Sequence, residues 1–120
     1  MMKQAFLAGT IIATLLPCAV LAQDSSSGVS EKIQRGEKLY QYWCATCHGR
    51  GPGHPGTQAL AERYQGAVPD VLADRTDLTP EMVQVFVRTG ISIMPFFRKT
   101  EISDSELADI GAFLSRNTPR

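Results

Sequence analysis

The sequence predicts an all-α fold of three to four helices, and three features of the chain indicate it. Apolar side chains recur at three- and four-residue spacing in separate stretches divided by irregular segments. Helix-initiating residues precede these stretches, and a glycine follows one of them. No convincing run of strand-forming residues adjoins the cysteine pair, and the sequence shows no internal repeat. We therefore expect one small helical domain.

Residues 1–22 are typical of a cleavable secretory signal peptide. A charged start at Lys3, an apolar stretch over residues 5–16 and a small-residue end at Ala22 follow one another. An uncleaved membrane anchor is the alternative, but Pro17 interrupts the run, which falls short of the roughly 20 apolar residues that a spanning helix needs. We expect export to the periplasm with cleavage after Ala22.

Cleavage there would leave 98 of the 120 residues, enough for one small domain but marginal for a core of side chains alone. Cys18 would carry a lipid if the leader were of the lipoprotein type, but Pro17 stands where such leaders usually have a small residue. The mature chain has nearly balanced charge and no expected membrane segment. Nothing in it indicates binding to nucleic acid or to an anionic membrane surface.

The mature chain is expected to begin with a flexible tether and a helix. Residues 23–29 have the polar, small-residue composition of a tether. Ser30 can cap a first helix, which leads directly to the cysteine pair. Its apolar or small positions at helical spacing are Ile33, Gly36, Leu39, Tyr40 and Trp43.

Further helices are expected beyond a glycine- and proline-rich loop at 49–56, with a short one over 57–64. Thr79-Pro80-Glu81 starts a third helix that should end at Gly90. An irregular segment follows over 91–100. Ser103 and Glu106 then form a capping box for the last helix. The residues expected to face inward are Met82, Val85 and Phe86, with Val83 as a further candidate, in the third helix and Leu107, Ile110, Phe113 and Leu114 in the last.

Five consecutive residues, Cys44-Ala45-Thr46-Cys47-His48, form the attachment signature of a c-type haem. Two thiols at this spacing can add across the two vinyl groups on one edge of the porphyrin, and the adjacent imidazole then reaches the iron. Export supports this interpretation, because haem is attached to such motifs outside the cytoplasm. We expect one covalent haem c, held by Cys44, Cys47 and His48, with His48 as an iron ligand.

Three other uses of the cysteine pair are open. A thioredoxin-like redox pair has the same spacing but normally lies where a strand enters a helix. A structural zinc site needs four ligands in separated pairs, whereas Cys44, Cys47, His48 and His54 lie close together in the sequence. A structural disulfide is the third alternative.

Met94 is the candidate for the second iron ligand. It lies in an irregular segment between two helices, beside Pro95, which restricts the backbone. Met82 occupies an apolar helix position, where methionine is more often core filling. The alternatives are His54, which is close to His48 in sequence, and an iron that is open or bound to water. Ligation by histidine and methionine raises the reduction potential and suits electron transfer better than catalysis.

Residues 30–118 resemble the class I mono-haem cytochromes c. The matching positions are Gly36 and Tyr40 in the first helix, the motif Cys44, Cys47 and His48, the turn Arg88-Thr89-Gly90, the segment Met94-Pro95, and Ile110 with Phe113 in the last helix. The resemblance implies a cytochrome c fold in which the glycine of the first helix lets the last helix cross closely. It also implies that a proline carbonyl in the first loop accepts the ring N–H of the proximal histidine. Pro52 and Pro55 both qualify, and we favour Pro55.

Residues 94–102 are more narrowly similar to the small cytochrome subunits of flavocytochrome phenol dehydrogenases, of the para-cresol methylhydroxylase and eugenol hydroxylase type. A generic short loop of the same fold is the alternative. The similarity implies a flavoprotein dehydrogenase as electron donor and a copper protein, cytochrome or oxidase as acceptor. In this segment Phe97 is the better candidate for a surface contact, whereas Ile93 and Phe96 are expected on the haem face, and Arg98 with Lys99 could steer an acidic partner.

Two classes of function follow from these observations. The first is an electron carrier that is not an enzyme, either as the subunit of a dehydrogenase or as a free-standing cytochrome that donates to a terminal oxidase. The second is a haem enzyme or sensor with an open iron. Bundles of the cytochrome c′ type carry their motif near the C-terminus, whereas this motif lies near the mature N-terminus, which favours the carrier.

Overall fold

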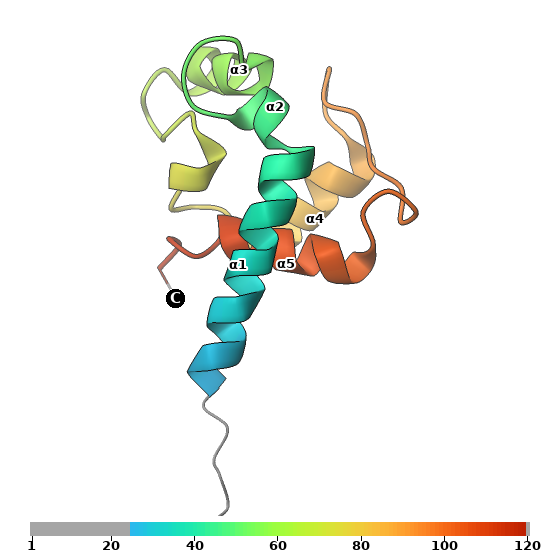
Figure 1. The fold of residues 1–120 in the computed structure, drawn as a ribbon. Helices are drawn as coiled ribbons and strands as arrows, with labels where there is room; N and C mark the ends of the chain where they lie inside the picture. Colours follow the sequence, from blue (N-terminus) through green and yellow to red (C-terminus); the bar gives the residue numbers. More distant parts are fainter. Residues whose placement is uncertain (1–24, 120) are drawn as a thin grey trace, which may run out of the picture.

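The computed structural model describes residues 25–119 (Figure 1), and the regular secondary structure of that range is helical, with no strand. The all-α prediction is therefore confirmed. Five α-helices lie within residues 25–119 instead of the expected three to four, because the cysteine motif forms a separate turn. The signal peptide expected at 1–22 lies outside the described residues. The elements are α1 (Ser25–Trp43), α2 (Ala45–His48), α3 (Pro55–Tyr64), the 3-10 helix η1 (Leu72–Asp74), α4 (Pro80–Thr89) and α5 (Asp104–Leu114).

Helix α1 begins earlier than the sequence indicates. Residues 25–29, expected to belong to a tether, are helical, and the predicted start at Ser30 is wrong. Side chains 26–30 are exposed, and this end of α1 extends beyond the other helices (Figure 1). Extending an existing helix adds one hydrogen bond for each residue that is fixed, so the packed part of α1 can continue outward as helix.

The crossing of α1 and α5 forms the centre of the fold. A Cβ atom at Gly36 would lie 2.0 Å from the Asp109 carbonyl oxygen, so only glycine permits this approach. One turn further along α1, the ring of Tyr40 packs against Phe113 with 5.3 Å between centroids. Arg35 Nε donates to Asp109 Oδ2 at 2.8 Å at the edge of the crossing. The close approach expected from the resemblance is present.

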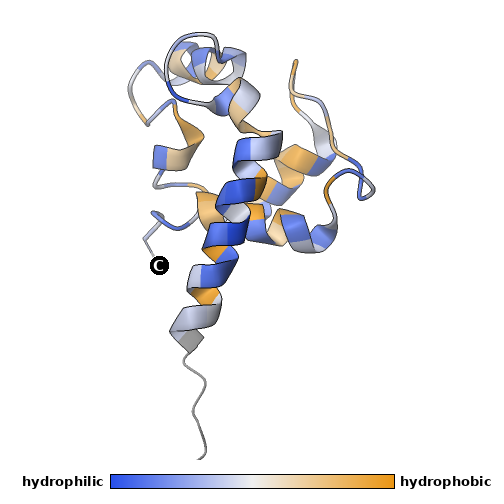
Figure 2. Ribbon diagram, in the orientation of Figure 1, coloured by the Kyte–Doolittle hydropathy of each residue, from blue (hydrophilic) through white to orange (hydrophobic). Residues whose placement is uncertain are grey.

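The two C-terminal helices differ in how well the sequence predicts their buried faces. All four residues expected inside from α5 are buried. In α4 the expected burial of Val83 is confirmed, but the prediction for Met82, Val85 and Phe86 is wrong, because these three are exposed and Val87 is buried instead. Figure 2 shows that α4 is apolar over much of its length. More than one side of the helix therefore carries apolar residues, and packing against α5 determines which side is buried.

Most of the predicted helix boundaries depend on residues next to the helix end, and most of them are confirmed. Thr79 accepts a hydrogen bond from the Met82 N–H at 3.2 Å before the first-turn proline of α4, and Gly90 ends that helix with φ of 68°. Ser103 and Glu106 form the capping box of α5. Helix α3 starts at Pro55, two residues before the prediction, because proline suits the first helical turn. Within residues 25–119, none of the helices has the length and apolarity that crossing a bilayer requires.

Candidate haem site

The cysteine motif lies at the junction of α1 and α2. Helix α1 ends at Trp43, Cys44 is the N-cap of α2, and Cys47 and His48 lie within its single turn. The Cys44 N–H donates to the Tyr40 carbonyl at 2.9 Å, and the His48 N–H donates to the Cys44 carbonyl at 2.8 Å, so the two helices are nearly continuous. Both thiols are free in the described part of the chain; Cys44 is half-buried and Cys47 is exposed.

Three side chains from flanking segments contact carbonyl groups in the motif and directly after it. The Tyr40 hydroxyl donates to the His48 carbonyl at 2.6 Å, and the Thr57 hydroxyl donates to the Gly49 carbonyl at 2.8 Å. His54 Nδ1 lies 3.0 Å from the Thr46 carbonyl oxygen. The carbonyls at the end of a helix have no partners within it, so these contacts satisfy them and fix the turn. Sequence reasoning missed the first two contacts, because neither residue type signals this use.

The imidazole of His48 is enclosed and retains an unused polar atom. Its Nδ1 atom is buried and has no hydrogen-bond partner among residues 25–119. A Cβ atom at Gly56 would lie 2.6 Å from His48 Cε1 and 2.8 Å from Nδ1, so the glycine makes room for the ring. Burial lowers the pKa of His48, which favours the neutral form that binds metals. Pro55, the expected acceptor, immediately precedes Gly56, but the bond itself is not formed in this geometry.

The surroundings of the thiols argue against redox chemistry at sulfur. Burial, with a smaller contribution from Cys47, raises the pKa of Cys44 to about 11. Reactive dithiols work instead through a lowered pKa that supplies thiolate at neutral pH. A structural zinc site also has no support, because the described chain holds no group of three or more candidate ligands.

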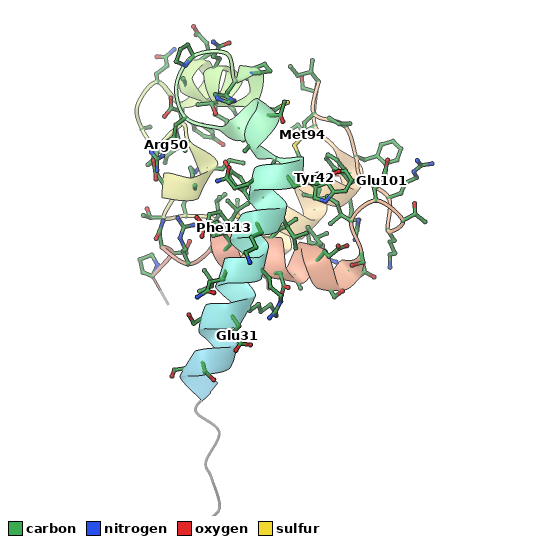
Figure 3. All side chains as sticks on the ribbon, viewed as in Figure 1. Glu31, Tyr42, Arg50, Met94, Glu101 and Phe113 are labelled. Atoms are coloured by element: carbon green, nitrogen blue, oxygen red, sulfur yellow. The ribbon has the colours of Figure 1, made fainter. Side chains whose placement is uncertain are left out.

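Met94 lies in a short loop that returns to the end of α1 (Figure 3). Its N–H donates to the Ile91 carbonyl at 2.9 Å, and the Ile91 N–H donates to the Met94 carbonyl at 3.1 Å. Met94, Trp43 and Cys44 pack against the same core, and the Phe97 ring meets the Trp43 ring edge-on at 5.9 Å between centroids. The fold therefore brings the loop of Met94 back to the beginning of the cysteine motif, although about 50 residues separate them in the sequence.

One side chain of this loop, Phe97, differs from the expectation in its exposure. Phe97, expected at the surface, is half-buried against Trp43, whereas Phe96 is 60% exposed and Ile93 is 80% exposed. The reason lies in the backbone: the Phe97 N–H donates to the Val87 carbonyl at 2.8 Å, and this bond directs the ring toward α1. Ile93 and Phe96 are thus the most exposed of the large apolar side chains of the loop, and Ile91 is 48% exposed.

Two arginines, missed by sequence reasoning, connect the segments that follow the motif. Arg50 of the first loop pairs with Asp74 of η1. Arg75 is buried, donates to both carboxylate oxygens of Asp77 at 2.6 Å, and lies 4.7 Å from the centroid of the Tyr64 ring. The Arg75 guanidinium also lowers the pKa of Asp77. The Arg75–Asp77 pair is local, whereas the Arg50–Asp74 pair and the contact between Arg75 and Tyr64 depend on tertiary proximity, which no local pattern indicates.

Comparison with known proteins gives one family. The family model described as cytochrome C oxidase, cbb3-type, subunit III matches residues 31–114, which is 84 of the 120 residues. The match runs from the second turn of α1 to the last residue of α5 and includes the cysteine motif and Met94. Neither a curated protein nor a solved structure gives a significant match.

Proposed function

Because the chain belongs to the cytochrome c oxidase, cbb3-type, subunit III family, we propose that it is an exported electron carrier that binds one covalent haem c. Membership implies a c-type cytochrome domain, haem-based electron transfer and redox partners. When bound, haem c supplies one-electron cycling between Fe(III) and Fe(II). The proposal adds the number of haems, their covalent attachment, the residues that hold the group and the cellular location.

One observation supports the proximal side most strongly: the Nδ1 atom of His48 is buried beside Gly56, burial lowers the pKa of the imidazole, and His48 follows two free thiols within one helical turn. Cys44 and Cys47 would each add an S–H bond across a vinyl group, which requires neither an oxidant nor a leaving group. His48 would bind the iron through Nε2 and keep Nδ1–H for an acceptor. We propose the Pro55 carbonyl as that acceptor, since it adjoins Gly56 at the ring.

Met94 would supply the second protein ligand to the iron. Its loop returns to the α1–α2 junction through the contact between Phe97 and Trp43, which supports a role for Met94 in the same site as the cysteine motif. A soft thioether favours Fe(II) and raises the reduction potential. A filled sixth position excludes small molecules, so this arrangement favours a carrier over a haem enzyme or sensor with an open iron.

The ligand assignment is tested by Met94→Ala, with Met82→Ala as the matched control in α4. We expect both variants to keep the mass of one attached haem. Only Met94→Ala should lose the weak near-infrared sulfur-to-iron band, bind carbon monoxide rapidly when reduced, and fall in potential by a sizeable part of the roughly 0.8 V that axial ligands span. A Met94→Ala protein with an unchanged band and potential would remove Met94 from the site.

The proximal assignment has its own test. Cys44→Ser and Cys47→Ser should each leave a single thioether bond, which intact mass under denaturing conditions and the shifted pyridine haemochrome spectrum would report. His48→Ala should not yield a stable holoprotein, because the proximal nitrogen is lost. Normal maturation of the histidine variant would contradict the proposed role of His48.

A flavoprotein dehydrogenase is our proposed electron donor, and a copper protein, cytochrome or oxidase is the proposed acceptor. Exposed Ile93 and Phe96 lie beside Met94 and support docking at this loop, since apolar side chains exposed together are frequent at interaction sites. Rapid-mixing kinetics of the oxidised cytochrome with the reduced, purified flavoprotein would test the donor. Slower reduction of an Ile93→Ser, Phe96→Ser double variant is the expected result, and an unchanged rate would argue against this surface.

A further inference from the structure

We propose that Arg88 is a positioning residue for Met94: its guanidinium ties the loop of residues 90–97 to α4 and α5 and so sets how often the thioether leaves the iron. This inference rests on the proposed ligation by Met94. It adds a function for a residue that does not itself contact the iron in that proposal.

Arg88 lies in the last turn of α4 and bonds to two other segments at once. Its Nη1 donates to the Phe97 carbonyl at 3.0 Å, and its Nη2 donates to Asp104 Oδ1 in the first turn of α5 at 2.9 Å. The side chain is only 17% exposed, and Nε is buried without a partner in the part of the chain that is described. The planar guanidinium thus bridges α4, the end of the loop and the start of α5, which an ammonium group could not do with the same geometry.

The loop has two anchors at its base, and both come from the end of α4. The Phe97 N–H donates to the Val87 carbonyl at 2.8 Å, while the Phe97 carbonyl accepts from Arg88. At the other end, Gly90 lies so close that a Cβ atom there would be 2.8 Å from the Met94 carbonyl oxygen. Met94 is therefore carried on a closed hairpin whose position depends on how firmly Phe97 is held.

Burial of apolar side chains is too limited in this loop to hold it in place without the hydrogen bonds of Arg88. Ile93 and Phe96 point outward, so the Phe97–Trp43 contact and the partial burial of Met94 are the apolar contacts that hold the loop to the core. Asp104, the carboxylate that orients Arg88, also accepts from Lys99 Nζ at 2.7 Å, and these two cations lower its pKa. Arginine stays charged across the ordinary pH range, so the anchor persists wherever Asp104 is ionised.

Loss of the anchor should change the rate of loop opening. Hydrogen bonds that involve a charged, largely buried group stabilise more than neutral ones, so their removal is expected to raise the opening rate by about tenfold or more. An external ligand for the ferric iron, such as imidazole, can bind only while Met94 is displaced. At high imidazole concentration the observed binding rate therefore reaches a plateau that equals the opening rate.

The experiment measures this plateau in the ferric holoprotein and in two variants at position 88. Arg88→Gln should raise the plateau rate by about tenfold or more, because the amide retains one donor but loses the charge and the second bond. Arg88→Lys keeps the charge, so its plateau rate should lie between those of Arg88→Gln and the unmodified protein. The control is Arg35→Gln, which removes the exposed pair with Asp109 at the α1–α5 crossing and should leave the plateau unchanged.

The outcomes separate this inference from the proposed function. An unmodified protein without the sulfur-to-iron band, in which imidazole binding shows no plateau, would overturn ligation by Met94. A protein with the band, in which Arg88→Gln opens no faster than the unmodified protein, would overturn the role of Arg88 alone. If Arg88→Gln does not yield holoprotein, Asp104→Asn provides the test. It keeps the bond to Phe97 but weakens its orientation, and an unchanged plateau in that variant would also overturn the proposal.

Discussion

The α1–α5 crossing and the loop of residues 90–97 are held in different ways. At the crossing, Gly36 brings two helices into backbone contact, and apolar side chains such as Ile110 are fully buried. In the loop, Ile93 and Phe96 are exposed, and hydrogen bonds to α4 hold the backbone. The crossing therefore determines whether the chain folds, whereas the loop determines how firmly a ligand on it is held. Substitutions in the two regions should have correspondingly different effects.

The largest effect is expected from Gly36→Ala. The added Cβ atom would lie 2.0 Å from the Asp109 carbonyl oxygen, and backbone cannot move aside without separating the helices. We expect a loss of more than about 4 kcal/mol in the free energy of unfolding, measured by guanidinium denaturation of the holoprotein. The control is Gly28→Ala on the same helix, which has nothing within 4 Å and should be neutral or slightly stabilising. Equal stability of the two variants would show that the close crossing is not required.

A second comparison uses isoleucine in both regions. Ile110 is fully buried in α5, and its replacement by alanine should lower the free energy of unfolding by about 3 kcal/mol through lost burial and a cavity. Ile93 is 80% exposed in the loop, and the same replacement there should change it by no more than about 0.5 kcal/mol. Denaturant titration of both holoproteins gives the two values. A large loss for Ile93→Ala would mean that the loop is stabilised by apolar burial after all.

The capping box at the start of α5 lies between the two regions. Ser103→Ala removes the side chain that accepts from the Glu106 N–H, and a lost helix cap costs about 1 kcal/mol. We expect that decrease in the free energy of unfolding, with the spectrum of the holoprotein unchanged. A change in the sulfur-to-iron band would instead indicate that this cap also positions the loop of Met94.

The smallest effect on the free energy of unfolding, counted per carboxylate, is expected from lowering the pH. Hydrogen bonds from Ser103 lower the pKa of Glu106, and bonds from Lys99 and Arg88 lower the pKa of Asp104. A carboxylate with a lowered pKa in the folded state adds stability above its unfolded pKa and loses that stability as the pH falls. The free energy of unfolding should therefore decrease as the pH falls below the ordinary range of these carboxylates, around 4. Ser103→Ala should reduce this pH dependence, and an identical slope in the variant would argue against the contribution of Glu106.

Local signals in the sequence predicted many of the element boundaries, whereas the choice between faces required the folded chain. Thr79, Gly90 and the pair Ser103 and Glu106 act within one turn of their own helices, so their effects can be read without a tertiary structure. Phe97 was expected to face outward, but its backbone bond to Val87 turns the ring toward Trp43. Neither the helix propensity of the residues nor the periodicity of apolar positions indicates a backbone bond between separate segments.

By itself, the sequence determined the helical class, the caps and the cysteine–histidine motif, because each depends on residues at most a few positions apart. Only the tertiary structure decided which face of α4 is buried, how His48 is enclosed by Gly56, and that Arg88 joins α4 to Phe97 and α5. These features arise where separate segments meet, and the energy of such contacts depends on packing and on the exclusion of water that folding itself creates.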